Sequence, residues 1–335
     1  MIKKILLILG AILVIVFGFL FLGWPTVNHN TVYGVTWSKP YAESLGLDPY
    51  AGLQAVLDDL SVRHFRIPVY WTEVEPKQGE FYWDSLTRQL EMIHARDGKV
   101  ILVLGAKQPR WPEWWVPAWV EMKTPQEQKD SQKLYVETVI KHFAPYGSMI
   151  EAWQVENESQ FPFGQHAPQD PSFVTEEMQL VRRVSQEQFP AGERPLIVTT
   201  DSGELSLWLG FHRDVDALGV SAYRAVVGPV VGLWHYWFVP PWFYARKATL
   251  LRPWIKSVFV SEFQMEPWAR KPLTELTPDE QIKNFDLPQM KKNFWFAERM
   301  NMSQIYFWGA EWWYWMKVKQ NHPEFWEGAK GFFRH

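Results

Sequence analysis

The chain has 335 residues, 47% of them hydrophobic and 16% aromatic, which suffices for one large globular domain with a short additional segment. Its 34 basic and 37 acidic residues give a net charge of -3. Neither sign forms a long run, so nucleic-acid binding is not expected. Cysteine is absent, which excludes disulfides, thiolate metal sites and cysteine nucleophiles.

The amino-terminal segment is long enough to cross a membrane. Residues 5–23 form an uninterrupted apolar stretch, whose helical length at about 1.5 Å per residue approaches the ~30 Å hydrocarbon core of a bilayer. No cleavage motif of small residues follows, and Trp24 stands where an interfacial aromatic residue would. An uncleaved signal anchor is therefore favoured over a removed signal peptide.

Two basic residues, Lys3 and Lys4, precede this apolar stretch and place the amino terminus in the cytoplasm. The sequence predicts a single-pass membrane protein in which residues 1–25 are the cytoplasmic lysines and the transmembrane anchor. Residues 26–335 are expected to form one extracytoplasmic catalytic domain, since no repeat, low-complexity tract or linker divides them.

After the anchor, short apolar runs rich in β-branched and aromatic residues alternate with helical patterns, as in repeated βα units around a parallel sheet. Several runs are continuously apolar, as expected for strands covered on both sides. The eight runs are Thr31–Trp37, Val62–Tyr70, Lys99–Gly105, Met149–Glu156, Pro195–Thr200, Asp216–Tyr223, Ser257–Glu262 and Ser303–Gly309.

Helix signals lie between these runs. Leu86, Leu90 and Ile93 recur at helical spacing, and Asp84 is predicted to be the N-cap of their helix. Two further helices are predicted to begin with a capping box and a proline, at Thr124-Pro125-Gln126-Glu127 and Thr277-Pro278-Asp279-Glu280.

The predicted fold is α/β, a (βα)8 TIM barrel preceded by one N-terminal transmembrane helix. A doubly wound open sheet also alternates strands and helices. It usually has a glycine-rich phosphate loop after its first strand, which residues 34–38 lack. Eight strands over about 300 residues favour the closed barrel.

Two glutamates follow apolar runs at the point where barrel active sites lie, the carboxyl ends of the strands. Glu158 follows the fourth run and Glu262 ends the seventh. Cleaving a glycosidic bond requires one carboxylic acid to protonate the leaving oxygen and one carboxylate to attack or to activate water. The alternative for each is structural, with Glu158 capping a helix and Glu262 forming an ion pair.

These features resemble clan A of the retaining glycoside hydrolases, whose barrels carry an Asn-Glu pair after strand four and a second glutamate after strand seven. The segment from Phe65 to Trp71 also looks like the clan's second strand, and the likeness covers essentially residues 31–333. The resemblance implies that Glu158 is the general acid and base and that Glu262 is the nucleophile.

The resemblance also implies roles for four other residues. Arg66 would be the strand-two arginine, where its charge would stabilise an ionised Glu262. The alternative is that Arg66 only pairs with a barrel carboxylate and closes the core. Asn157 would bind the sugar 2-hydroxyl, Tyr223 would approach the nucleophile, and Trp308 would form a sugar platform. One departure is Ser221, which stands where many clan members have a histidine.

Aromatic residues crowd the segment after the third run, Gln108–Trp119. Trp111 is predicted to form the wall of a substrate subsite, because its flat ring can stack on a sugar. Trp312, Trp313 and Trp315 after the eighth run compete for this role, and packing between loops is the alternative for all four.

Residues 226–254 after the sixth run combine aromatic, apolar and basic side chains. That composition is typical of an interfacial membrane contact, and ordinary packing against the barrel is the alternative. If this segment touches the bilayer, a lipid-linked or surface glycan is the favoured substrate.

The sequence thus predicts a glycosidase that cleaves O-glycosidic bonds, with β-linked ones favoured, of an extracytoplasmic oligosaccharide, polysaccharide or glycoconjugate. The reaction would retain configuration through a covalent glycosyl-enzyme intermediate on Glu262, without a metal or organic cofactor. Two alternatives stay open: a transglycosylase that uses the same site, and a noncatalytic, membrane-tethered carbohydrate-binding barrel.

Overall fold

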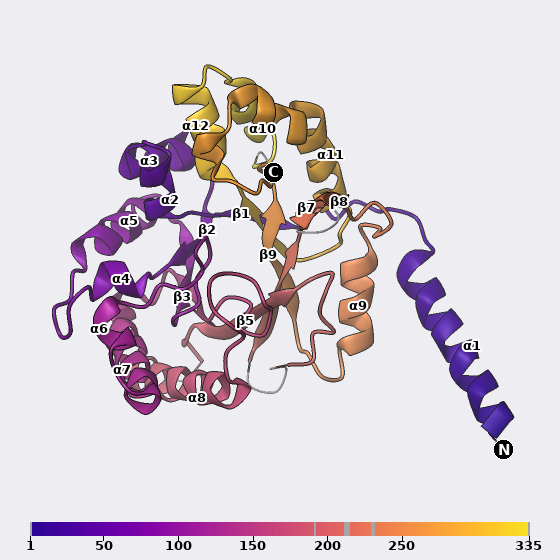
Figure 1. Ribbon diagram of the computed structural model, residues 1–335, viewed down its shortest axis with the longest axis horizontal. Coiled ribbons are helices and arrows are strands. Elements are labelled where there is room, and N and C mark those ends of the chain that lie inside the picture. The colour runs from indigo at the N-terminus through magenta and orange to yellow at the C-terminus, as the bar shows by residue number, and fades with distance from the viewer. Residues whose placement is uncertain (1, 191, 211–214, 229–231, 334–335) are drawn as a thin grey trace.

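The computed structural model describes residues 2–190, 192–210, 215–228 and 232–333. Eight parallel strands form a closed barrel in the order β1-β10-β9-β6-β5-β4-β3-β2. Helices surround the barrel, and one long helix, α1, projects away from it (Figure 1). The closed order confirms the predicted TIM barrel and excludes the doubly wound open sheet.

All eight predicted strands are confirmed. An antiparallel hairpin, β7 and β8, follows the sixth barrel strand, so the predicted seventh and eighth strands are β9 and β10. The strands are β1 Val32–Thr36, β2 His64–Pro68, β3 Lys99–Leu104, β4 Ile150–Val155, β5 Leu196–Ser202, β6 Ala217–Ala222, β7 Ala225–Gly228, β8 Gly232–His235, β9 Val258–Gln264 and β10 Gln304–Trp308.

Long helices cover most of the barrel strands, and short ones occupy the loops. The helices are α1 Ile2–Phe21, α2 Lys39–Ser44, α3 Pro49–Asp58, α4 Trp71–Val74, α5 Asp84–His94, α6 Ala118–Glu121, α7 Pro125–Phe143, α8 Pro171–Gln188, α9 Phe243–Leu251, α10 Pro278–Asn284, α11 Leu287–Glu298, α12 Ala310–Lys319 and α13 Glu324–Ala329. Two 3₁₀ turns lie at Ala144–Tyr146 and Leu273–Glu275.

Local capping chemistry explains where several helices begin. Both predicted capping boxes form, at Thr124 with Glu127 and at Thr277 with Glu280. The predicted N-cap at Asp84 is wrong by one residue. Trp83 occupies the cap, and Asp84 is the first helical residue, where a negative charge favours the helix dipole.

The barrel interior and its outer surface are packed separately. Ile101, Ala152, Val198 and Phe259 belong to a small cluster inside the barrel, whereas a much larger core joins the strands to the helices. Because side chains alternate between the two faces of a strand, residues two positions beyond Ala152 and Val198 also point into the barrel. The polar side chains at these positions, Gln154 and Thr200, therefore lie inside the barrel toward its carboxyl end.

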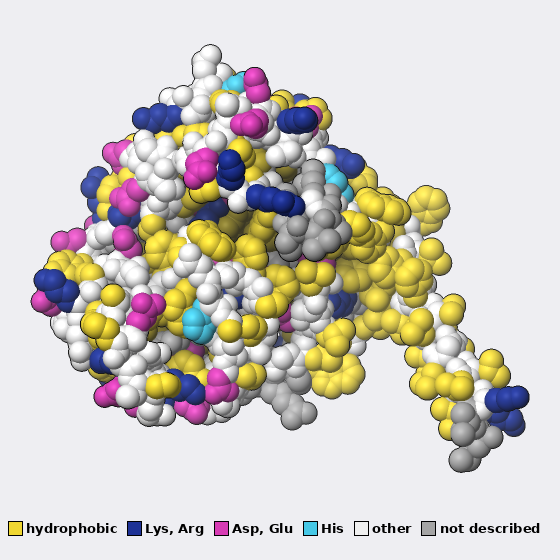
Figure 2. Space-filling model, viewed as in Figure 1, with side chains coloured by type: hydrophobic (Ala, Val, Ile, Leu, Met, Phe, Trp, Pro, Cys, Tyr) yellow, Lys and Arg dark blue, Asp and Glu magenta, His cyan; other side chains and the backbone are white. Residues whose placement is uncertain are grey.

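Helix α1 is apolar and lies outside the barrel. Lys3–Phe21 is the one segment of the described residues that is long and apolar enough to span a membrane, and none of its residues is buried. Figure 2 shows its hydrophobic side chains continuing onto the adjoining edge of the barrel domain.

Candidate active site

A β-bulge in β9 directs Glu262 into the barrel. Val260 pairs with Val220 on β6, but the next β6 residue, Ser221, pairs with Glu262, so β9 contains one extra residue there. The register on the β10 side shifts at the same place. Phe259 faces the interior and Val260 faces the outer core. A regular strand would therefore turn Glu262 outward, and the bulge reverses its direction.

Two side chains hold the Glu262 carboxylate. Arg66 Nη1 donates to Oε1 at 2.8 Å, and the Tyr223 hydroxyl donates to Oε2 at 2.9 Å. Arg66 is fully buried on β2, and Glu262 is only 4% exposed. Burial and the neighbouring Glu262 charge hold the pKa of Tyr223 well above its ordinary value, so this phenol stays a donor.

Arg66 also connects the nucleophile candidate to β4. Its Nε donates to Gln154 Oε1 at 2.7 Å and its Nη2 donates to Asn157 Oδ1 at 2.6 Å. Three rigid contacts to one guanidinium place Asn157 and Glu262 on the same side of the barrel opening. The structure thus brings together Arg66, Asn157, Tyr223 and Glu262, which lie on four different barrel segments.

Glu158 lies at the end of the β4 segment in a different environment. Ser221 Oγ donates to its Oε1 at 2.6 Å, and its backbone N–H donates to Thr200 on β5 at 2.9 Å. Burial, with the nearby Glu262 charge as the second cause, raises the pKa of Glu158 to about 8, although the Ser221 hydrogen bond opposes the shift. Glu158 therefore carries a proton at neutral pH, as a general acid requires.

The backbone of this segment is held in an uncommon conformation. Glu156 and Glu158 have φ values of 59° and 45°, in the left-handed region that non-glycine residues rarely adopt. Glu156 accepts hydrogen bonds from the N–H groups of Ala106 and Lys107. Lys107 Nζ donates to the carbonyl oxygen of Glu158 at 2.8 Å. These contacts to the β3 loop fix the direction of the Glu158 side chain.

Glu113 is a third carboxyl group at this site. It lies in the loop after β3, it is 7% exposed, and one of its oxygens is 3.7 Å from Lys107 Nζ. Burial raises the pKa of Glu113 well above its ordinary value, Lys107 opposes the shift, and the charges of Glu158 and Glu262 add to it. The site therefore holds three acidic side chains near one another, and the sequence pointed to two of them.

The aromatic residues divide into rim and core. Trp111 is 63% exposed and its ring contacts Phe163, which contacts Trp268, which in turn packs edge-on against Tyr223. This row of rings crosses from the β3 loop to β6 beside Glu262. Trp308 ends β10 and is 8% exposed, with the Arg110 guanidinium 3.9 Å from its ring centroid.

The interpretation of the tryptophans after β10 as competing subsite walls is wrong. Trp312, Trp313 and Trp315 are buried on α12. Trp312 donates to Gln281 and Trp313 donates to the carbonyl oxygen of Met265, so both fasten α12 to its neighbours. Indole rings buried in this way contribute to packing and leave no face on which a sugar could stack.

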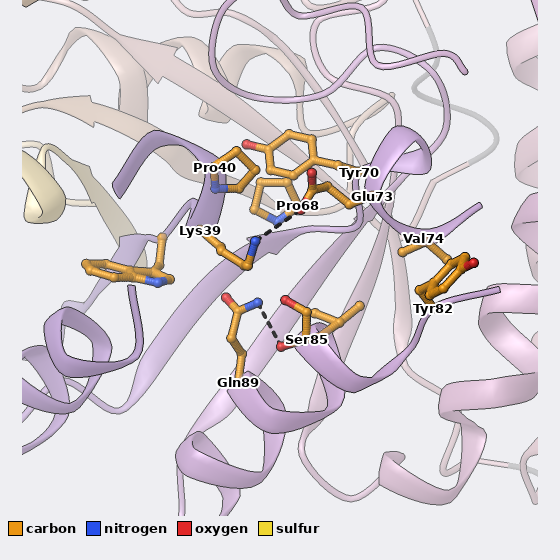
Figure 3. A pocket seen from close by; sticks show the side chains of 11 residues that line it. Lys39, Pro40, Pro68, Tyr70, Glu73, Val74, Tyr82, Ser85 and Gln89 are labelled. Carbon is orange, nitrogen blue, oxygen red and sulfur yellow. Dashed lines mark hydrogen bonds and ion pairs between the residues drawn. The ribbon is translucent and has the colours of Figure 1, made fainter. Parts of the chain in front are cut away.

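A separate pocket lies outside the ends of β1 and β2. Lys39, Tyr70, Glu73, Ser85 and Gln89 are among its lining residues, and Lys39 extends toward Glu73 there (Figure 3). None of the predicted site residues lines it. This pocket is therefore distinct from the carboxyl groups at the barrel centre.

Several site residues escaped the sequence analysis. Glu113, Arg110, Trp268, Phe163 and Lys107 lie in loops, and their own neighbours in the chain give no strand-end signal. For Arg110 and Glu113, the signal in the sequence is the density of aromatic and charged residues in Gln108–Trp119, the segment that also contains Trp111. Thr200 and Gln154 were discoverable as polar residues within inward-facing apolar runs.

The barrel resembles several solved structures. An exo-beta-1,4-mannosidase from an Opitutaceae bacterium matches with 15% identity and a TM-score of 0.53, over 84% of this chain and 54% of that one. GH5_18 from Bifidobacterium longum subsp. longum matches with 12% identity and a TM-score of 0.58, over 83% of this chain and 69% of that one. A beta-galactosidase from the psychrophilic Marinomonas ef1 matches with 13% identity and a TM-score of 0.54, over 82% of this chain and 53% of that one.

At these identities the likeness establishes a shared fold, the closed eight-stranded barrel. This chain spans about half the length of the mannosidase and of the galactosidase. No protein-family model and no curated protein matches the sequence.

Proposed function

We propose that the chain is a retaining glycoside hydrolase with Glu262 as nucleophile and Glu158 as general acid and base. The observation that carries the proposal is the contrast between the two carboxyl groups. Glu262 is bound by a buried guanidinium and a phenol, whereas the pKa of Glu158 is raised to about 8. Glycosidases need one ionised and one protonated carboxyl group at the same site.

The first step forms the glycosyl-enzyme. A Glu262 oxygen attacks the anomeric carbon while the bond from that carbon to the leaving oxygen breaks, and Glu158 transfers its proton to that oxygen. Arg66 and Tyr223 direct Glu262 toward the sugar through their hydrogen bonds. Asn157 is held by Arg66 beside the nucleophile, where its amide group would contact the hydroxyl group next to the anomeric carbon.

The second step releases the sugar. The ionised Glu158 removes a proton from water, the water oxygen attacks the anomeric carbon, and the bond to Glu262 breaks. A sugar hydroxyl group that replaces water gives transglycosylation, so both reactions share the intermediate. The glycosidase names of the solved neighbours support this chemistry at the level of the fold.

Trapping of the intermediate tests this proposal. The full-length protein in detergent is incubated with activated 2-deoxy-2-fluoro glycosides of the common hexoses, and intact mass and peptide mapping locate any adduct. We expect one adduct, on Glu262, and none in Glu262→Gln. The exposed Glu121→Gln variant is the matched control and should label normally. An adduct on another side chain would refute the nucleophile assignment.

Absence of an adduct together with absence of turnover on a broad glycoside panel would favour the noncatalytic sugar-binding barrel. In that case, glycan binding would be unaffected by Glu262→Gln. A transglycosylase would label on Glu262 and would transfer the sugar to an added acceptor in preference to water.

We further propose that α1 anchors the protein in a membrane, with residues 1–25 as the anchor and residues 26–335 as the extracytoplasmic domain. Lys3 and Lys4 lie at the end of α1 that is farther from the barrel. Because basic residues favour the cytoplasmic side of a membrane span, this arrangement supports a barrel on the opposite side. The anchor end near the barrel packs on α9. The ring centroids of Phe21 and Phe243 are 5.4 Å apart, and Arg246 Nη1 donates a hydrogen bond to the carbonyl oxygen of Leu22 at 2.6 Å.

This packing supports a membrane contact for the segment 226–254, of which residues 229–231 lie outside the described residues. Trp237, Phe238 and Trp254 are 81%, 45% and 51% exposed, close in the chain to the helix that receives the anchor. Exposed aromatic rings beside a membrane span are suited to the headgroup region. The mouth of the barrel would then be near a bilayer surface, and a lipid-linked or surface glycan would be within reach.

A further inference from the structure

The loop after β3 crosses the ends of β2 and β1 before it reaches the far side of the barrel. The Tyr70 hydroxyl donates to the carbonyl oxygen of Pro109 at 2.9 Å and lies 2.8 Å from Ser38 Oγ. Tyr70 follows β2 and Ser38 follows β1, so three successive strand ends are joined. The next residue, Arg110, adopts a φ of 76° and extends beyond them.

Two aromatic rings and two carboxylates, from three other segments of the chain, hold the Arg110 guanidinium. Its guanidinium lies between two rings, with centroids at 3.7 Å for Tyr41 and 3.9 Å for Trp308. Arg110 Nη1 pairs with Glu266, and Nη2 pairs with Glu311 Oε2 at 2.8 Å. We name these five residues the Arg110 clamp.

The three charged residues of the clamp are buried. Arg110 is 5% exposed, Glu266 6% and Glu311 0%, and Glu311 also accepts a hydrogen bond from the Ser38 backbone N–H at 2.6 Å. Buried charges with two partners and two stacked rings leave their positions only at a large cost in free energy. The clamp therefore forms a fixed wall and closes this part of the opening.

The wall lies opposite the proposed acid. In the closed barrel β10 is four strands from β4 in either direction, so Trp308 at the end of β10 faces the Glu158 segment across the opening. Glu158 must contact the leaving oxygen, so the leaving group lies on the β4 side. The other end of the bound sugar, its nonreducing end, must point toward the clamp.

We propose that the Arg110 clamp ends the substrate site on the nonreducing side, so that the enzyme is exo-acting and removes one terminal sugar at a time. This inference rests on the proposed hydrolase function. A chain continuing beyond the bound sugar would have to occupy the volume that Arg110, Tyr41 and Trp308 fill. On the leaving-group side, the nearest aromatic ring of the β3 loop is that of Trp111, which is 63% exposed and contacts Phe163 in the loop after β4.

The order of product release tests the inference in the wild-type, full-length protein. Para-nitrophenyl β-glycosides of mannose, glucose and galactose are compared with the para-nitrophenyl disaccharides of the same sugars, and first products are identified by mass spectrometry. From the para-nitrophenyl disaccharides we expect the free monosaccharide and the para-nitrophenyl monosaccharide as first products. Their amount should exceed that of the released intact disaccharide on the order of a hundredfold. Release of the intact disaccharide as the main first product would overturn the inference and leave the hydrolase function standing.

Absence of cleavage in both series, together with absence of a trapped adduct, would overturn the proposed function and this inference with it.

Arg110→Ala tests the wall itself. We expect intact-disaccharide release to rise relative to monosaccharide release by on the order of tenfold. Arg183→Ala, an exposed arginine on α8, is the matched control and should keep the wild-type ratio. If Arg110→Ala fails to fold, Tyr41→Ala removes one ring of the sandwich and leaves both ion pairs. An unchanged ratio in a folded variant would assign the clamp a purely structural role and contradict the proposal.

Discussion

Ser221 Oγ lies 2.6 Å from Glu158 Oε1, and it donates a hydrogen bond to the carboxyl group that we propose as acid and base. Tyr223, two residues later on the same strand end, donates instead to Glu262. The end of β6 thus donates one hydrogen bond to each of the two carboxyl groups. Ser221, which stands where many clan A glycoside hydrolases have a histidine, contacts Glu158, whereas Tyr223 contacts Glu262.

Replacement of this serine should change the pH profile. In Ser221→Ala the hydrogen bond that favours the ionised form is lost, so the pKa of Glu158 should rise above its value of about 8. The alkaline limb of kcat/KM should move to higher pH, and kcat should fall on the order of tenfold because the ionised base is formed less readily. Ser185→Ala, at a buried serine on α8, is the control. An alkaline limb that stays in place would show that Ser221 does not act on Glu158.

Arg66 should not tolerate lysine. Its contacts to Gln154, Asn157 and Glu262 need the planar guanidinium, and a lysine ammonium supplies at most part of them. We expect Arg66→Lys to lower kcat at least on the order of a hundredfold and to destabilise the fold by about 3–5 kcal/mol, because partners in a fully buried site lose their contacts. Turnover and urea unfolding measure the two effects. Arg63→Lys, which binds backbone carbonyl groups only, should have the smaller effect on kcat. Equal kcat losses in both variants would argue against the assignment.

The stability of the fold should depend on pH through Glu158. Its pKa of about 8 in the folded protein exceeds the value of about 4.3 in an unfolded chain. Below pH 4 both states carry the proton. As the pH rises from there to about 8, the unfolded chain ionises first, so the carboxyl group increasingly destabilises the fold. Glu158→Gln should therefore gain free energy of unfolding relative to wild type, by at most about 1.4 kcal/mol per pH unit, over this range.

Urea unfolding at several pH values measures this difference, with the exposed Glu121→Gln as control. A difference between Glu158→Gln and wild type that is constant with pH would contradict the raised pKa.

Trp111 should act on substrate binding and not on the chemical step. Its ring is 63% exposed at the rim, on the row of rings that reaches Tyr223. In Trp111→Ala we expect KM to rise on the order of tenfold with kcat within about twofold, since one stacking contact is lost. Trp295→Ala, a 44% exposed tryptophan on α11, should change neither constant. A loss of kcat without a change in KM would place Trp111 in the chemical step instead.

The membrane contact can be mapped with single labels, because the chain contains no cysteine. Trp237→Cys and Leu134→Cys, at positions 81% and 64% exposed, are labelled with an environment-sensitive dye in full-length protein in vesicles. The label at position 237 should shift to the blue and be quenched by spin-labelled lipids. The label on α7 at position 134 should remain in water. Identical spectra at both positions would exclude the contact.

Much of the fold was predictable because its signals are local. Apolar runs marked all eight barrel strands, and the capping boxes at Thr124 and Thr277 marked two helix starts. The error at Asp84 was also local, since several residues near a helix start can serve as its cap. The burial of Trp312 and Trp313 was not predictable, because a tryptophan after a strand can pack inward or face a cleft, and only its neighbours decide which.

The sequence by itself determined the barrel and the two strand-end glutamates, because the period of apolar residues and the ends of the runs are written in consecutive residues. Only the tertiary structure decided how Glu262 faces the interior, through a bulge whose extra residue is visible only against β6 and β10. It also decided that Glu113 approaches Glu158 and Glu262 and that Arg110 reaches across to Trp308. These contacts join residues far apart in the chain, and their energies depend on burial and distance, which no local pattern contains.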